Sequence, residues 1–240
     1  MFSGHYFSPI PDPETLPVSL EEMVAGDSLP VLNLIIGSNR NESLMYIPEG
    51  AELTDYLEGY FPPENWEDIK AMLGADLSEL AQMDRLRSAL RYTCPSLSLA
   101  QAAQEAGGSA YVYRFDRMRE GFEAIGAYHG AELPYVFDTH DPWMPTNAID
   151  HQITDAAVDY WIAFLTTGSP NESQSGRTET GDPEMGGSEI NSAEKGRAMW
   201  SAWSQQQQAL VIADEISTQT HPDAALCEFL DAARVASARH

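Results

Sequence analysis

The sequence has few cysteines, and it has no motif of a metal site and no long apolar run. Its two cysteines, Cys94 and Cys227, are too few to define a disulfide framework by counting. No CxxC or HExxH motif and no cluster of histidine and cysteine occurs, so we expect no metal site and no cofactor. No stretch of about 18 apolar residues occurs, so we expect no transmembrane helix. The first residues also lack the basic start and the apolar stretch of a signal peptide.

Basic residues are scarce beside acidic ones. The chain has 13 lysines and arginines against 37 acidic residues, a formal net charge of −24, and its only lysines are Lys70 and Lys195. Such a charge repels phosphates and anionic membranes, so we expect neither nucleic acid nor a membrane as a partner. The acidity fits a solubilising surface, and it also fits adaptation to salt water, where ions screen self-repulsion. Composition leaves both interpretations open.

The pattern of apolar residues predicts an α/β protein. With 240 residues, 43% of them hydrophobic, the chain can bury a large core, and we treat residues 1–240 as a single domain. Short apolar runs predict strands at Val31–Ile36, which Gly37 closes, at Ala110–Phe115 and at Ala209–Ala213. Helices are predicted within residues 63–92, at Ser98–Ala106, at residues 149–166 and at Pro222–Ala238. Strands mixed with helices of this length indicate a parallel sheet flanked by helices, with an open edge that needs more strands.

Two segments are predicted to lie outside the core. Residues 1–30 are rich in proline and acid, which is typical of an extended surface segment. Residues 171–196 hold almost no large apolar side chain, so we expect a flexible loop there. Within residues 63–92, Leu77, Leu80, Met83, Leu86 and Leu90 recur at helical spacing and should face the core.

Four side chains could carry acid–base chemistry: Glu42, His129, Glu132 and His140. Taken singly, each has a simpler explanation. An acid after a strand is usually a solvated loop residue, and a lone histidine in a loop is usually a polar residue of the surface. Glu42 follows the first predicted strand and His129 follows the second, 87 residues later. Their sequence contexts favour a catalytic interpretation for this pair, and we treat His140 as a surface residue.

Five collinear segments resemble the type-B carboxylesterases, the cholinesterase-like family. Residues 37–42 read GSNRNE, which is similar to the family's turn G-[TS]-N-x-[DN]-E, and residues 126–138, GAYHGAELPYVFD, resemble its histidine loop. Residues 7–31 resemble the proline-rich approach to the acid strand. DYWIAFLTTGSPN at 159–171 and CEFLD at 227–231 resemble later family segments, and MWSAWS at 199–204 is a weaker match.

The resemblance implies the C-terminal half of an α/β-hydrolase fold and a carboxylic-ester hydrolase. Glu42 would be the acid and His129 the general base of a serine–glutamate–histidine triad, in the chain order of this fold. Glu132 and Tyr135 would position the histidine loop or line the active-site gorge. The partner of such a site is a small-molecule ester.

The nucleophile of that triad is missing from the sequence. No G-x-S-x-G motif occurs, and no HGGG-type oxyanion segment occurs. We therefore expect the chain alone to be inactive, as a fragment or a split product that needs an absent N-terminal half. Two alternatives remain open: a non-catalytic binding or adhesion module of the cholinesterase-like kind, and an unrelated α/β module.

The resemblance also implies a disulfide between Cys94 and Cys227. Cys94 resembles the cysteine that precedes the histidine strand in cholinesterases, and Cys227 resembles its partner near the C-terminus. A structural disulfide indicates an oxidising compartment. We therefore expect a secreted or periplasmic parent protein, whose signal peptide would lie in the absent N-terminal half.

Overall fold

The structure, a computed structural model, describes residues 12, 14–15, 18–26, 28–172 and 197–237. Within these residues a mixed four-stranded sheet has the order β1-β2-β3-β4. The strands are β1 (Asn33–Asn39), β2 (Ser109–Phe115), β3 (Gln208–Ile212) and β4 (Ile216–Thr220). The helices are α1 (Leu20–Ala25), α2 (Leu53–Glu58), α3 (Trp66–Gly74), α4 (Glu79–Ser88), α5 (Cys94–Glu105), α6 (Leu133–Val136), α7 (Ala148–Thr167) and α8 (Ala224–Ser237). Short 3₁₀ turns occupy Leu44–Tyr46 and Pro63–Asn65.

The three predicted strands are present and parallel. β1 pairs with β2 along its whole length, from Asn33 opposite Ser109 to Asn39 opposite Phe115, and β2 pairs with β3. β4 was not predicted. It pairs antiparallel with β3, and its ISTQT sequence is too polar and too exposed to form an apolar run.

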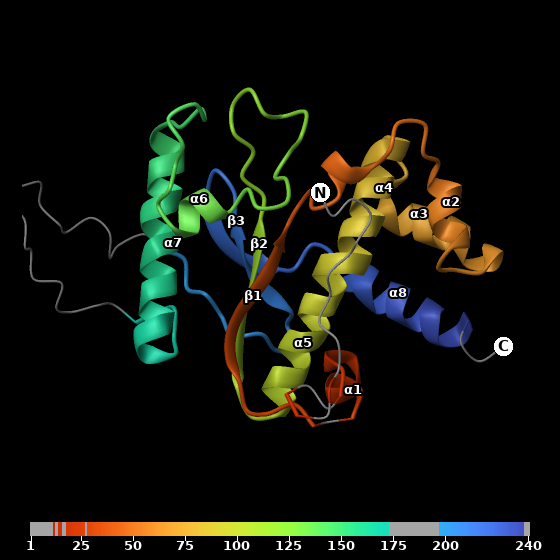
Figure 1. The fold of residues 1–240 in the computed structure, drawn as a ribbon, viewed down its shortest axis with the longest axis horizontal. Coiled ribbons are helices and arrows are strands. Elements are labelled where there is room, and N and C mark those ends of the chain that lie inside the picture. The colour runs from red at the N-terminus through yellow and green to blue at the C-terminus, as the bar shows by residue number, and fades with distance from the viewer. Residues whose placement is uncertain (1–11, 13, 16–17, 27, 173–196, 238–240) are drawn as a thin grey trace, which may run out of the picture.

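The sheet separates two hydrophobic cores because alternate side chains of a strand point to opposite faces. Ala110 and Val112 of β2 pack with helices α2–α5 and α8, whereas Tyr111 and Phe115 pack with α6 and α7. Figure 1 shows α7 on one side of the sheet and α4, α5 and α8 on the other. The expected arrangement of a sheet flanked by helices is therefore confirmed.

The prediction that Gly37 closes the first strand is wrong. The strand begins two residues later than predicted, leaving Val31 exposed, and it continues through Gly37 to Asn39. Gly37 lies opposite Tyr113, and a Cβ at this position would come within 2.2 Å of the Tyr113 carbonyl oxygen and within 2.6 Å of its ring. Glycine here allows the backbone and the ring of Tyr113 to approach closely, and it does not end the strand.

The N-terminal segment is not wholly extended, since α1 forms within it. Ser19 caps this helix by accepting from the backbone N–H of Glu22, whose side chain in turn accepts from the N–H of Ser19. The loop expected at 171–196 lies outside the described residues from 173 onwards. No helix in the described ranges is both long enough and apolar enough to cross a membrane.

The C-terminal helix α8 is attached to the body of the domain in two ways. A disulfide joins Cys227 to Cys94 at the start of α5, with the two Cα atoms 5.2 Å apart. Asp223, just before α8, pairs with Arg85 of α4 at 2.7 Å and with Arg114 of β2. Both attachments link α8 to elements that precede it by more than 100 residues.

Candidate active site

The structure brings Glu42 and His129 together. The loops that follow β1 and β2 lie at the same edge of the sheet, because the carboxyl ends of parallel strands meet there. The imidazole Nδ1 of His129 lies 2.6 Å from the Glu42 carboxylate. The Glu42 side chain is buried, whereas 48% of the His129 side chain is exposed. The pair is therefore a carboxylate held inside the protein and an imidazole presented at its surface.

The turn that carries Glu42 directs its carboxylate towards His129. One carboxylate oxygen accepts the backbone N–H of Asn39 at 2.7 Å, and the other faces His129. Burial raises the pKa of the Glu42 carboxyl, while the hydrogen bonds from Asn39 and His129 act in the opposite direction. The negative charge of Glu132 adds to the increase in this pKa.

The histidine loop is joined to the acid loop by backbone contacts. The N–H of Asn41 donates to the carbonyl of Ala127 at 3.0 Å, and the N–H of Ala127 donates to the Asn41 side chain at 3.1 Å. Gly126 has a φ of +62°, and a Cβ there would lie 2.2 Å from Oδ1 of Asn41. A glycine is therefore required for the two loops to approach this closely.

Two tyrosines lie beside the imidazole. The ring of Tyr92 has its centroid 5.3 Å from that of His129, and the ring of Tyr46 lies at 6.3 Å. Tyr92 belongs to a π-helical turn, Ala89–Thr93, inserted between α4 and α5. Such turns widen a helix by one residue and occur often at functional sites.

Glu132 and Tyr135 both contact neighbouring elements. Glu132 accepts a hydrogen bond from the side-chain amide of Asn39, which places it beside the acid loop. Tyr135 is buried, and its hydroxyl donates to Asp150 of α7 at 2.7 Å. The described residues therefore place Tyr135 in the α6–α7 interface.

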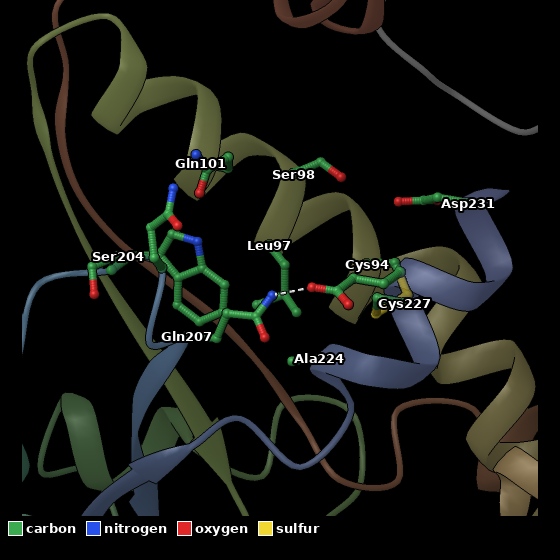
Figure 2. Close-up of a pocket in the computed structure, with 12 residues that line it drawn as sticks. Cys94, Leu97, Ser98, Gln101, Ser204, Gln207, Ala224, Cys227 and Asp231 are labelled. Carbon is green, nitrogen blue, oxygen red and sulfur yellow. Dashed lines mark hydrogen bonds between the residues drawn. A yellow bond between two sulfur atoms is a disulfide. The ribbon is translucent and has the colours of Figure 1, made fainter.

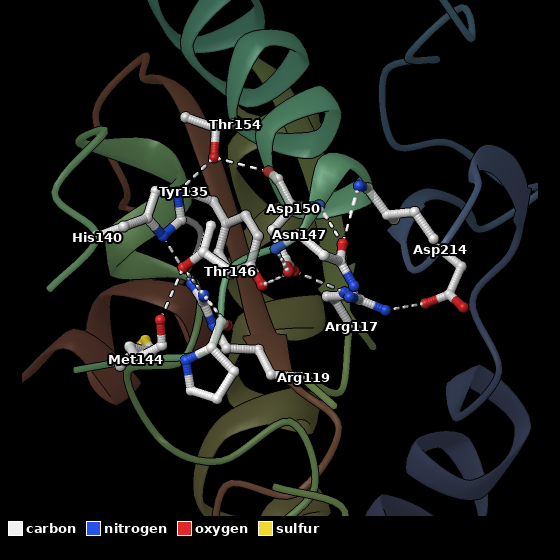
Figure 3. A network of polar contacts seen from close by, with 12 residues as sticks. Arg117, Arg119, Tyr135, His140, Met144, Thr146, Asn147, Asp150, Thr154 and Asp214 are labelled. Carbon is white, nitrogen blue, oxygen red and sulfur yellow. Dashed lines mark hydrogen bonds and ion pairs between the residues drawn. The ribbon is translucent and has the colours of Figure 1, made fainter. Parts of the chain in front are cut away.

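The expectation that His140 is a surface residue is wrong. His140 is partly buried, with Nδ1 2.7 Å from the guanidinium of Arg119 and Nε2 2.7 Å from the hydroxyl of Thr154. Burial, with the charge of Arg119, lowers the pKa of its imidazole. Figure 3 shows His140 among these groups, together with the ion pair between Arg117 and Asp150. This network fixes α6 against α7, and it is separate from the Glu42–His129 pair.

Sequence reasoning missed Asn39 and Asp84. Asp84 lies at a buried position of α4 and accepts from the Asn41 amide at 2.8 Å and from the N–H of Ser43 at 3.1 Å. The sequence held one clue to the burial of Asp84: this acidic residue lies between Met83 and Leu86, which were predicted to face the core. Asn39 lies inside the motif that identified Glu42, and only the fold shows what its side chain contacts.

No metal-binding cluster of histidine, cysteine and carboxylate residues occurs in the part of the chain that the structure describes. A pocket of about 400 Å³ lies between α5 and α8, and both disulfide-bonded cysteines are among the residues that line it (Figure 2). Gln207 and Glu228 bond to each other across this pocket, and none of the residues that line it belongs to the Glu42 or His129 loop. The site therefore consists of the paired side chains at the sheet edge.

Comparison with known proteins gives a consistent group of matches. The Carboxylesterase family matches residues 72–230, a range that includes His129 and both cysteines and leaves Glu42 outside. Para-nitrobenzyl esterase of Bacillus subtilis (strain 168) is 25% identical over 180 residues, covering 69% of this chain and 35% of that protein. Neuroligin-2 of Homo sapiens is 25% identical over 201 residues, covering 69% of this chain and 24% of that protein.

A solved structure of a PNB esterase has the same fold. It superposes with a TM-score of 0.63 at 22% sequence identity, covering 94% of this chain and 44% of that chain. The present chain therefore spans about a third or less of the two curated relatives and under half of this structure.

Proposed function

Because the chain belongs to the carboxylesterase family, we propose that it supplies the acid and the histidine of a serine esterase that hydrolyses small carboxylic esters. The observation that carries this proposal is the contact of 2.6 Å between Glu42 and Nδ1 of His129, at the ends of two adjacent parallel strands. The similarity to para-nitrobenzyl esterase supports the class of substrate.

The arrangement suits general acid–base catalysis. Glu42 accepts the Nδ1–H of His129, which keeps Nε2 unprotonated and able to take a proton from a serine hydroxyl. The imidazolium that forms is stabilised by the buried carboxylate beside it. His129 then returns the proton to the leaving alcohol, and a second cycle with water releases the acid.

The serine and the oxyanion amides come from polypeptide outside these 240 residues in this proposal. No G-x-S-x-G motif occurs in the sequence, and a serine elsewhere lacks the strained strand-to-helix turn that exposes the nucleophile. Without a nucleophile no acyl-enzyme forms, so the chain alone is inactive. The missing N-terminal half is then the protein partner of this chain.

The same proposal places the parent protein in an oxidising compartment, secreted or periplasmic. Its support is the Cys94–Cys227 disulfide, since such bonds persist where thiols are not kept reduced.

A second candidate function is a non-catalytic binding module, which the match to neuroligin-2 favours. The two candidates differ in their use of His129. A binding module has no need for one fixed tautomer of an imidazole, whereas a triad depends on it.

The deciding experiment measures the tautomer of His129 by ¹⁵N NMR of the purified chain. We expect the Nδ1–H form, with a downfield proton that disappears in a Glu42→Ala variant. His129→Gln assigns the signal among the six histidines of the chain. A His129 that is mainly Nε2–H in the unmodified protein would overturn the triad assignment and favour the binding module.

A second measurement tests the missing nucleophile. A fluorophosphonate probe labels only activated serines, and p-nitrophenyl acetate reports turnover. We expect neither labelling nor turnover above that of His129→Gln. A labelled serine in the chain itself would show that a nucleophile had been overlooked.

A further inference from the structure

Asn39 contacts both loops of the candidate site. It is the last residue of β1 and is only 2% exposed. Its backbone N–H donates to Glu42 at 2.7 Å. Its side-chain Nδ2 donates to the carbonyl of Tyr128 at 2.7 Å and to the carboxylate of Glu132. One residue thus holds the acid through its main chain and the histidine loop through its side chain.

The two side-chain contacts of Asn39 lie on either side of His129. Tyr128 directly precedes the histidine and Glu132 follows it by three residues. The loop is therefore fixed at both ends of the stretch that carries the imidazole. A primary amide has two N–H groups, and both are used here.

Only an amide of this length and orientation meets these requirements. Turning the amide over would place Oδ1 against a carbonyl and a carboxylate, so the acceptors determine which way it points. In that orientation Oδ1 has no hydrogen-bond partner among the described residues, although it is buried. An unsatisfied buried acceptor is costly, so the two donated bonds have to offset the desolvation of Oδ1.

We propose that Asn39 is a positioning residue, whose side-chain amide fixes His129 so that Nδ1 meets Glu42. This inference rests on the proposed function, because the alignment of the pair matters for a triad. Asn39 acts through the loop, because its side-chain hydrogen bonds go to Tyr128 and Glu132 and not to His129. Glu132 is the anchor for one of its two bonds.

The test compares the tautomer and the downfield proton of His129 in the unmodified chain and in Asn39→Ala. The backbone bond from residue 39 to Glu42 survives this change, so only the hold on the histidine loop is lost. We expect the Nδ1–H signal to be lost or averaged with the Nε2–H form.

Asn39→Asp separates hydrogen bonding from space filling. Aspartate has nearly the same shape, but its carboxylate donates nothing and repels Glu132. If donation positions the loop, Asn39→Asp perturbs His129 at least as much as Asn39→Ala. If Asn39 only fills space, Asn39→Asp retains the Nδ1–H signal, and the proposal is overturned.

Asn171→Ala is the matched control. Asn171 also joins two distant segments through its amide, with Nδ2 2.8 Å from the carbonyl of Trp200 and Oδ1 2.8 Å from its N–H. If Asn39 acts locally on the histidine loop, Asn171→Ala lowers the stability of the protein but leaves the Nδ1–H signal of His129 unchanged.

If Asn39→Ala does not fold, two variants of Glu132 test whether the bond from Asn39 positions the histidine loop. Glu132→Gln keeps an oxygen that can accept from Asn39, whereas Glu132→Ala does not. We expect the first to retain the Nδ1–H form and the second to weaken it. Equal signals in both variants would contradict the proposal. The unmodified chain tests the triad itself, so a failure of that assignment is distinguishable from a failure at Asn39.

Discussion

Asp84 lies against the turn that presents Glu42, with its Oδ1 3.1 Å from the backbone nitrogen of Ser43. Ser43 is the residue after Glu42, and Asp84 also accepts from Asn41, the residue before it. The carboxylate is buried, and burial raises its pKa even though hydrogen bonds from Asn41 and Ser88 oppose the increase. Through Asp84, helix α4 thus holds the residues on both sides of Glu42.

Asp84→Ala should destabilise the protein by about 2–4 kcal/mol, because it leaves buried donors in the acid turn without acceptors. Urea unfolding followed by tryptophan fluorescence measures the free energy of unfolding. Glu67→Ala is the control, since that carboxylate is 88% exposed and its pair with Lys70 should contribute less than about 1 kcal/mol. Similar losses for both variants would contradict the role of Asp84.

His221 should make stability depend on pH between about 4 and 6.5. Burial, with the positive charge of Arg114, lowers the pKa of this imidazole to about 4. The folded protein therefore favours neutral His221, whose contribution is complete above the unfolded pKa near 6.5 and is lost as the pH falls towards 4. The total is about 3 kcal/mol at most.

His221→Asn tests this dependence. The Nδ1 atom of His221 accepts the backbone N–H of Asp223 at 3.1 Å, and an asparagine Oδ1 can take over this bond without titrating. Unfolding free energies measured from pH 7 to 4.5 should fall less steeply in the variant. Parallel profiles for the two proteins would show that His221 does not drive the loss.

Added salt should raise the melting temperature. The net charge of −24 destabilises the compact state through self-repulsion. This repulsion weakens as the Debye length falls from about 10 Å at 0.1 M to about 3 Å at 1 M. Thermal unfolding in sodium chloride and in choline chloride should show the same increase if screening is the cause. A melting temperature that stays flat or falls would contradict this expectation.

The unreduced protein should have no free thiol when denatured, because Cys94 and Cys227 are joined. The double variant Cys94→Ala/Cys227→Ala should lose up to about 4–5 kcal/mol, since the bond closes a loop of 133 residues. The loss should fall below this value if the ion pairs of Asp223 still hold α8 in place. Thiol titration and urea unfolding measure the two outcomes, and two titratable thiols would exclude the bond.

The sequence predicted the elements whose signal is local. The apolar run after Val31, the run ending at Phe115 and the helix before Gly168 each have a pattern of their own, and the structure contains all three. The side chains of Glu42 and His129 were placed together because their motifs resemble the acid and histidine segments of one family, and because each follows a predicted strand. Their pairing at 2.6 Å agrees with that placement.

Features that depend on tertiary contact were not predictable. Gly37 looked like a strand end, because the Tyr113 ring that requires it comes from another strand. Leu77 and Leu80 shared the helical spacing of Met83 and Leu86 but are exposed, since Leu77 precedes α4 and Leu80 lies in its first turn. The side-chain contacts of Asn39 join residues about 90 positions apart, so no local sequence pattern predicts these contacts.

The separation between the two cysteines also has a consequence during synthesis. A ribosome adds roughly 5–20 residues per second, so Cys227 follows Cys94 by about 7–27 s. During that interval β2 and the His129 loop are made and join β1 and the Glu42 loop, while the covalent link to α8 cannot yet form. Until then the contact between Glu42 and His129 forms without the disulfide, and Cys94 has no second cysteine of this chain with which to pair. The disulfide can therefore form only late in synthesis, and a folding catalyst that keeps Cys94 from pairing with other thiols should raise the yield of correctly bonded protein.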